Sequence, residues 1–143
     1  MTSAFENLVG AGKPLKAEPP DAKEFAGLIL SAQRRLQDAR KPSLSLESRF
    51  DLAYNAAHAL CLAALRWHGY RSGNRYIVFQ LLPHTLGLGP EVWRVLAKCH
   101  DMRNLGEYEG DLNVDERIVA DLIIACDEVA VKVSEMSPIS EPD

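Results

Sequence analysis

The sequence has few of the residues that build metal centres and disulfide frameworks. No two of its three cysteines, Cys61, Cys99 and Cys126, form a CxxC or similar metal-binding pair. Its four histidines show neither the HExxH pattern nor an i, i+4 pairing. We therefore expect no metal site and no cofactor. We interpret the cysteines as buried, reduced thiols of a cytoplasmic protein.

Long uninterrupted apolar runs are also missing. The most apolar stretch, residues 56–65, is interrupted by His58 and is much shorter than the roughly 20 residues that cross a bilayer. Residues 1–5 show neither the basic region nor the apolar region of a secretory signal. We expect no membrane span and no leader, and we interpret residues 56–65 as part of a core helix.

Several catalytic and binding patterns have no counterpart in the chain. It has no glycine-rich phosphate loop and no serine on a glycine-flanked elbow between a strand and a helix. A net charge of −4 argues against a protein that coats DNA, because such binding neutralises many phosphates with Lys and Arg. This charge still permits a local basic site.

The composition is that of one soluble globular domain. Hydrophobic residues make up 47% of the 143 positions and charged residues 25%, which excludes a disordered or fibrous body. A chain of this length can bury a single core and is too short for two ordinary domains. We expect a flexible N-terminal arm over residues 1–20, a folded bundle over 21–136 and a flexible tail over 137–143.

Apolar residues recur three and four positions apart in four segments, which predicts four long helices. The first runs from the cap at Asp21 to about Arg40, and the second from about Ser45 to His68. The third begins at Pro90, and the fourth follows a capping-box spacing at Asn113. The apolar segment 76–82 would suit a strand equally well. With no second strand candidate we predict a short helix there, and thus an all-α, antiparallel bundle.

Polar chemistry is densest in residues 99–110, where the third long helix ends. Arg103 carries a planar, permanently charged guanidinium, Asn104 an amide and Tyr108 a phenol, which together are parts of an anion site. Five helical residues turn through about 140°, so Arg103 and Tyr108 share a site only if the helix ends between them or a partner subunit completes the site. Gly106 and Gly110 favour such an ending.

Histidines and a basic loop are weaker candidates. His100 precedes Arg103 by three residues and can form an acid/base and anion pair with it, or it is only a surface histidine near a helix end. We interpret His58 as a core or helix-contact residue. A basic and aromatic patch around one loop can follow a nucleic-acid backbone, although an ordinary solvated loop is the favoured interpretation. This patch consists of Arg66, Tyr70, Arg71, Arg75 and Tyr76.

The chain resembles the HEPN superfamily over roughly residues 22–136. The resemblance rests on the alanine-rich segment 50–59, on the helical bundle and on Arg103-Asn104 followed by an aromatic residue. HEPN proteins include bacterial toxins of toxin–antitoxin operons and ribonucleases of defence systems. Their motif is an Arg, usually followed by a polar residue, with a His four to six positions after the Arg, and a dimer joins two motifs in one RNA-cleaving cleft. The resemblance implies that Arg103 binds the scissile phosphate and that Asn104 supports it.

Tyr108 stands where the HEPN ribonucleases have their histidine. A free tyrosine is ionised only about one part in a thousand at pH 7, so as a base it would add roughly 4 kcal/mol to the barrier. It can still act as an acid or donate a hydrogen bond to a phosphate. We predict catalytic roles for Arg103, Tyr108 and His100, and substrate-binding roles for Asn104 and Glu107.

Three interpretations of this stretch stay open. It can be a metal-independent ribonuclease site with an altered base, an RNA- or nucleotide-binding site without turnover, or a helix terminus and dimer interface. The first two predict a homodimeric, RNA-acting toxin of a toxin–antitoxin or defence system. The alternative is a non-catalytic module that holds a protein partner, such as a nucleotidyltransferase-type antitoxin.

Overall fold

The computed structural model describes residues 4–110 and 113–140, without the side chains of residues 107–109. Over this range the chain is mostly helical, which confirms the all-α class and the four long helices. The long helices are α1 (Ala22–Ala39), α2 (Leu46–Trp67), α5 (Pro90–Glu109) and α6 (Glu116–Ser134). The shorter elements are η1 (Glu6–Leu8), β1 (Lys16–Ala17), β2 (Tyr70–Arg71), α3 (Arg75–Gln80) and α4 (Leu82–Thr85).

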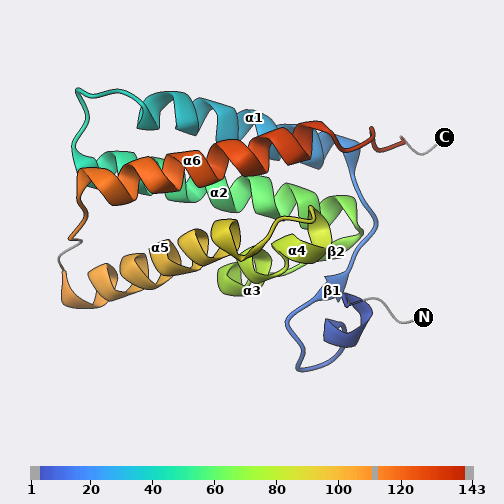
Figure 1. The fold of residues 1–143 in the computed structure, drawn as a ribbon. Helices are drawn as coiled ribbons and strands as arrows, with labels where there is room; N and C mark the ends of the chain where they lie inside the picture. Colours follow the sequence, from blue (N-terminus) through green and yellow to red (C-terminus); the bar gives the residue numbers. More distant parts are fainter. Residues whose placement is uncertain (1–3, 111–112, 141–143) are drawn as a thin grey trace.

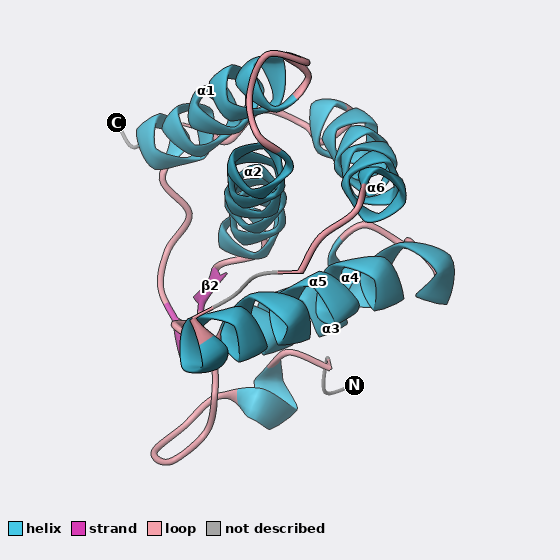
Figure 2. Cartoon of the chain, turned by 90° about the vertical axis from the view of Figure 1, so that its left-hand side faces the viewer, coloured by secondary structure: helices cyan, strands magenta, loops and turns pink. Residues whose placement is uncertain are grey.

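Helix α2 is the centre of the bundle. It packs against α1 and α6 on one side and against α3, α4 and α5 on the other, as Figures 1 and 2 show. Its buried side chains include many alanines, whose small size lets neighbouring helices approach closely. These alanines are Ala53, Ala56, Ala57, Ala59, Ala63 and Ala64.

Local hydrogen bonds explain where the helices begin. The Asp21 carboxylate accepts from the Glu24 N–H at 2.9 Å, and the Ser45 hydroxyl accepts from the Ser48 N–H at 3.1 Å, at the predicted caps. The prediction for α6 is wrong by two residues. Its cap is Asp115, which accepts from the Ile118 N–H at 2.9 Å, because a carboxylate three residues before that N–H satisfies it directly.

The predicted single short helix is two consecutive short helices. Asn74 caps α3 by accepting from the Ile77 N–H at 3.2 Å, and α3 gives way to α4 at Leu81. Pro83, just past the predicted segment 76–82, lies in the first turn of α4. A proline is tolerated there because the first N–H groups of a helix have no partner within the helix.

Helix α5 continues through Gly106 and ends at Gly110. The φ angle of Gly110 is +73°, and its N–H donates to the Gly106 carbonyl at 2.8 Å. A glycine in this left-handed conformation is a common helix terminator. The expected ending between Arg103 and Tyr108 is therefore wrong, and position 108 lies about 140° around the helix axis from position 103.

The N-terminal segment packs on the bundle where we expected a flexible arm. Within the described residues of this segment, Phe5 is 8% exposed and Leu15 2%, and β1 pairs antiparallel with β2. The Phe5 ring lies 5.0 Å from the His68 ring and 5.1 Å from the Tyr70 ring, measured between centroids. These apolar side chains are too few and too irregularly spaced to form a periodic pattern, which is why the sequence did not reveal this packing.

Arg66, at the end of α2, holds the N-terminal segment against the bundle through hydrogen bonds and ion pairs. Its side chain is only 2% exposed and donates to the carbonyl oxygens of Glu18 and Pro19 at 2.8 and 2.6 Å. It also pairs with Glu24, whose carboxylate it shares with Arg71. These bonds satisfy the carbonyl groups of a segment that its prolines keep out of a helix.

The three cysteines are buried and free, as expected. Burial raises the pKa of the Cys99 thiol to about 12 and raises that of Cys61 well above its ordinary value. Such thiols stay protonated near neutral pH and are poor nucleophiles.

Candidate functional site

One face of α5 carries three of the predicted site residues. His100, Arg103 and Asn104 are spaced three and four residues apart and lie on the same side of the helix. The side chains of His100 and Arg103 are 18% and 29% exposed, so both can be reached from solvent. The structure therefore brings these three together on a partly open surface.

The buried Tyr54 ring of α2 lies beneath two guanidinium groups. The Cζ atom of Arg103 is 5.2 Å from the ring centroid, and that of Arg75, from α3, is 5.5 Å from it. Both distances are within the range of a cation–π contact. We call the side chains around this ring the Tyr54 cluster. It comprises Asp51, Tyr54, Asn55, His58, Arg75, Tyr76, Phe79, His100, Arg103 and Asn104.

Polar side chains of α2 hold both guanidinium groups. Asn55 Oδ1 accepts from Arg75 at 3.0 Å, and Asp51 Oδ1 lies 3.5 Å from Arg103 Nε. Asp51 is 57% exposed, so its ion pair with Arg103 is screened by solvent and weak. Burial raises the pKa of Tyr54, and the two guanidinium groups oppose part of that rise. Tyr54 is therefore a neutral platform near pH 7.

His58 is the second imidazole of the cluster. Its ring lies 6.2 Å from the Phe79 ring, edge to face. Burial, followed by the charge of Arg75 and then by His100, lowers the pKa of His58 to about 4. His58 is therefore neutral near pH 7.

His100 sits among aromatic rings. Its centroid is 5.8 Å from that of Tyr76, 6.4 Å from that of Phe79 and 6.5 Å from that of Tyr54. Its Nδ1 atom is buried with no hydrogen-bond partner among the described residues, and Asp101 Oδ1 lies 3.6 Å away. Its Nε2 atom is 3.5 Å from Asn104 Nδ2. One ring nitrogen thus faces a carboxylate and the other an amide.

Two predicted site residues lie outside the described side chains. The backbone of Glu107 and Tyr108 belongs to α5, and their side chains are not described. The roles predicted for them stay predictions.

Sequence reasoning missed the α2 part of the cluster, and it placed Arg75 and Tyr76 of α3 in the loop patch and not beside Arg103. Polar residues at 51, 55 and 58 interrupt an otherwise apolar helix with i, i+4 and i+7 spacing, which is a signal for one polar stripe. The position of Arg75 beside this stripe had no comparable signal, because only the packing of α3 on α2 brings it there. The remaining arginines of the predicted loop patch, Arg66 and Arg71, bind Glu18 and Glu24.

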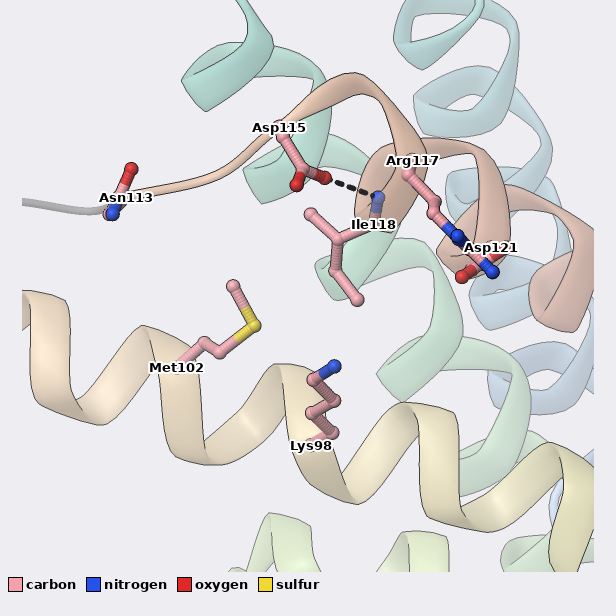
Figure 3. A pocket seen from close by; sticks show the side chains of 7 residues that line it. All are labelled: Lys98, Met102, Asn113, Asp115, Arg117, Ile118 and Asp121. Carbon is pink, nitrogen blue, oxygen red and sulfur yellow. Dashed lines mark hydrogen bonds between the residues drawn. The ribbon is translucent and has the colours of Figure 1, made fainter.

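A hollow of about 180 Å³ lies between α5 and the start of α6 (Figure 3). Its side chains carry both signs of charge, and the Asp115 carboxylate is engaged in capping α6. Its lining is Lys98, Met102, Asn113, Asp115, Arg117, Ile118 and Asp121. Because its charges balance, this hollow is a weaker anion site than the Tyr54 cluster.

Two further findings bear on the class of protein. Among the side chains described, no three His, Cys, Asp or Glu residues gather as a metal site would require. Within the described ranges, no helix combines the length and the apolar character needed to cross a bilayer.

Comparisons with protein-family models, with curated proteins and with solved structures found no match to this chain. The fold and the cluster define an all-α bundle with two guanidinium groups over one buried ring and two imidazoles against a second.

Proposed function

We propose that this protein acts on RNA, whose phosphodiester backbone binds at the Tyr54 cluster. The observation that carries the proposal is that Arg75 and Arg103, from different helices, both lie within 5.5 Å of one buried ring. Guanidinium groups stay charged and bind phosphate with paired hydrogen bonds. Two of them at one half-buried position form a local positive site on a chain of net charge −4.

The preference for RNA rests on the resemblance to the HEPN superfamily and on the two histidines. Imidazoles beside a bound phosphate can exchange a proton with a ribose 2′-hydroxyl, a group that DNA lacks. The same resemblance supports a role as the toxin of a toxin–antitoxin or defence system, with metal-independent RNA cleavage as its activity.

The first experiment measures binding of a fluorescent single-stranded RNA by anisotropy in the presence of EDTA. We expect Arg103→Ala and Arg75→Ala to weaken binding by about 10- to 100-fold, the equivalent of one charge-assisted hydrogen bond. Arg94→Ala is the matched control, because Arg94 is exposed on the same helix α5 and lies 5.9 Å from the Trp93 ring, outside the cluster. Equal losses in all three variants, or no binding by the wild type, would overturn the proposal.

A homodimer is part of the same proposal, because the resemblance implies that two α5 helices form one cleft. Leu105, next to the cluster on α5, is 57% exposed and is a candidate contact. Light scattering after size-exclusion chromatography should give twice the chain mass for the wild type and the monomer mass for Leu105→Glu. A wild-type monomer at high concentration would contradict the dimer and leave RNA binding to be judged by the anisotropy assay.

A second candidate function is that of a module that holds a protein partner. An apolar groove of about 440 Å³ runs between α1 and α6, with Leu30 47% exposed at its edge. Apolar grooves of this kind bind partner chains. If a nucleotidyltransferase-type protein is encoded beside this chain, co-purification of the two should survive Arg103→Ala and be lost in Leu30→Asp. The reverse pattern would exclude the groove.

A further inference from the structure

We propose that a hollow beside the docked N-terminal segment binds a small organic anion that carries an apolar body. This hollow, which we call the β1–β2 hollow, has a volume of about 450 Å³ and lies between residues 9–17 and residues 71–73, where β1 pairs with β2 (Figure 1). It shares no lining residue with the Tyr54 cluster or with the groove between α1 and α6. The inference therefore does not depend on the proposed RNA function.

Contacts with the rest of the fold hold both sides of the β1–β2 hollow in place. On the β1 side, Leu15 is 2% exposed, and its N–H donates to the Leu8 carbonyl at 3.0 Å. On the β2 side, Arg71 donates hydrogen bonds to the carboxylates of Glu18 and Glu24. A ligand that enters a hollow with preformed walls loses less free energy in ordering them.

The lining of the hollow combines positive charge with apolar surface. Among the described residues that line it, none is an acid and three are cations, namely Lys13, Lys16 and Arg71. Val9 and Pro14 add apolar wall. Binding sites for small molecules are mostly apolar, with a few polar groups that fix the orientation of the ligand. An anion joined to an apolar body therefore matches both parts of this lining.

The two lysines supply the positive charge that the ligand would meet. The two glutamates bound to Arg71 offset its charge, whereas neither Lys13 nor Lys16 forms an ion pair with a described side chain. Lys13 Nζ donates to the Asn7 carbonyl at 3.2 Å, which holds the ammonium group without cancelling its charge. Since an ammonium group has three donors, both lysines can bind a phosphate or a carboxylate.

A buried hydroxyl in the same lining adds a donor with a fixed direction. Ser72 is 7% exposed, and its Oγ atom accepts from the Asn74 N–H at 3.0 Å. The hydroxyl donates to no described group, so its proton is available to an oxygen of the ligand. A buried donor without an acceptor costs free energy, and a bound anion would remove that cost.

Two kinds of small molecule share this chemistry, and the probes distinguish them. A mononucleotide carries a phosphate on a nucleoside, and AMP is its probe. An aromatic acid carries a carboxylate on an apolar ring, and 2-naphthoate is its probe. Two control compounds each lack one part of the chemistry. 2-Naphthalenemethanol keeps the ring without the charge, and inorganic phosphate keeps the charge without the apolar body.

The experiment titrates each compound into the nitrogen-15-labelled full chain and follows the amide chemical shifts. We expect AMP or 2-naphthoate to shift the amides of residues 9–17 and 71–73 with a Kd below about 1 mM, and both control compounds to bind at least about tenfold more weakly. The double variant Lys13→Ala/Lys16→Ala should weaken binding about tenfold or more. Lys23→Ala/Lys132→Ala is the matched control, because these lysines are exposed on α1 and α6, outside the hollow.

The position of the shifted amides decides between the sites of this protein. Shifts confined to the groove between α1 and α6 or to the Tyr54 cluster would overturn the inference, as would no shift with either anion. Equal affinity for a control compound, or equal losses in the two double variants, would overturn it too. None of these results changes the RNA anisotropy assay, so this inference and the proposed function can fail separately.

Discussion

The lowered pKa of His58, a residue of the candidate site, makes the stability of the fold depend on pH. Its pKa in the folded protein is about 4, below the ordinary value of 6.5, because the native surroundings disfavour the charged ring. The unfolded chain therefore binds more protons than the folded chain between these two values. The His58 contribution to the free energy of unfolding is fully present above pH 6.5 and is lost as the pH falls toward 4.

We predict that the free energy of unfolding falls by about 2–3 kcal/mol between pH 7.5 and pH 4.5 through this one group. Urea unfolding of the wild type and of His58→Gln, measured at half-unit pH steps from 7.5 to 4.5, checks this. The Arg71 and Arg66 hydrogen bonds lower the pKa values of Glu18 and Glu24, whose contributions are lost below their ordinary value of 4.5, outside this range. Parallel curves for the two proteins would contradict the prediction.

Arg66 and Arg71 bind the same two carboxylates, those of Glu18 and Glu24, but their side chains differ in solvent exposure. Arg66 is 2% exposed and Arg71 36%. Removing the buried cation takes one of two donors from the Glu24 carboxylate and leaves two backbone carbonyls without their donor, whereas water can replace the more exposed cation. We predict that Arg66→Met destabilises the fold by about 3 kcal/mol and Arg71→Met by about 1 kcal/mol or less. Urea unfolding measures both, and equal losses would be inconsistent with this difference.

At the scale of single elements, two glycines have opposite expected effects. Gly27 lies exposed inside α1, where a Cβ atom would meet nothing within 4 Å. Gly110 terminates α5 at a φ of +73°, which an L side chain adopts only with strain. Gly27 therefore destabilises α1, whereas Gly110 is needed to end α5.

We predict that Gly27→Ala stabilises the protein by about 0.5–1 kcal/mol and that Gly110→Ala destabilises it by about 1 kcal/mol. Thermal unfolding should shift upward for the first variant and downward for the second. A stabilising Gly110→Ala would mean that α5 does not depend on this terminator.

At the scale of the whole molecule, the N-terminal segment is part of the fold. Phe5 packs between the rings of His68, Tyr70 and His84, at the end of the bundle where β1 pairs with β2 (Figure 1). The segment thus depends on contacts with parts of the chain more than 50 residues away. Such a docked segment can open without unfolding the helices.

We predict that Phe5→Ala speeds tryptic cleavage after Lys16 severalfold while the helical circular dichroism is retained, because the lost apolar contact destabilises this segment by roughly 2–3 kcal/mol. Leu105→Ala serves as the control, since Leu105 is 57% exposed and far from this segment in the chain. Unchanged cleavage would show that β pairing alone holds the segment.

The long helices could be predicted because their signals are local. The caps at Asp21 and Ser45 and the spacing of apolar residues involve positions within four of each other. Prediction failed where two nearby residues offered the same local signal. Asp115, and not Asn113, caps α6, and α5 ends at Gly110, with Gly106 inside the helix. The side chains of Glu107 and Tyr108 are not described, so the roles predicted for them stay predictions.

The sequence by itself determined the helical class and the polar face of α5 with His100, Arg103 and Asn104, because both follow from the helical period. Only the tertiary structure decided that Arg75 and His58 join that face. These two residues are 17 positions apart and lie on different helices, and their meeting depends on how α3 packs against α2 around the buried Tyr54 ring. No local pattern encodes such a contact, because the packing of whole helices, and not the spacing of neighbours, sets it.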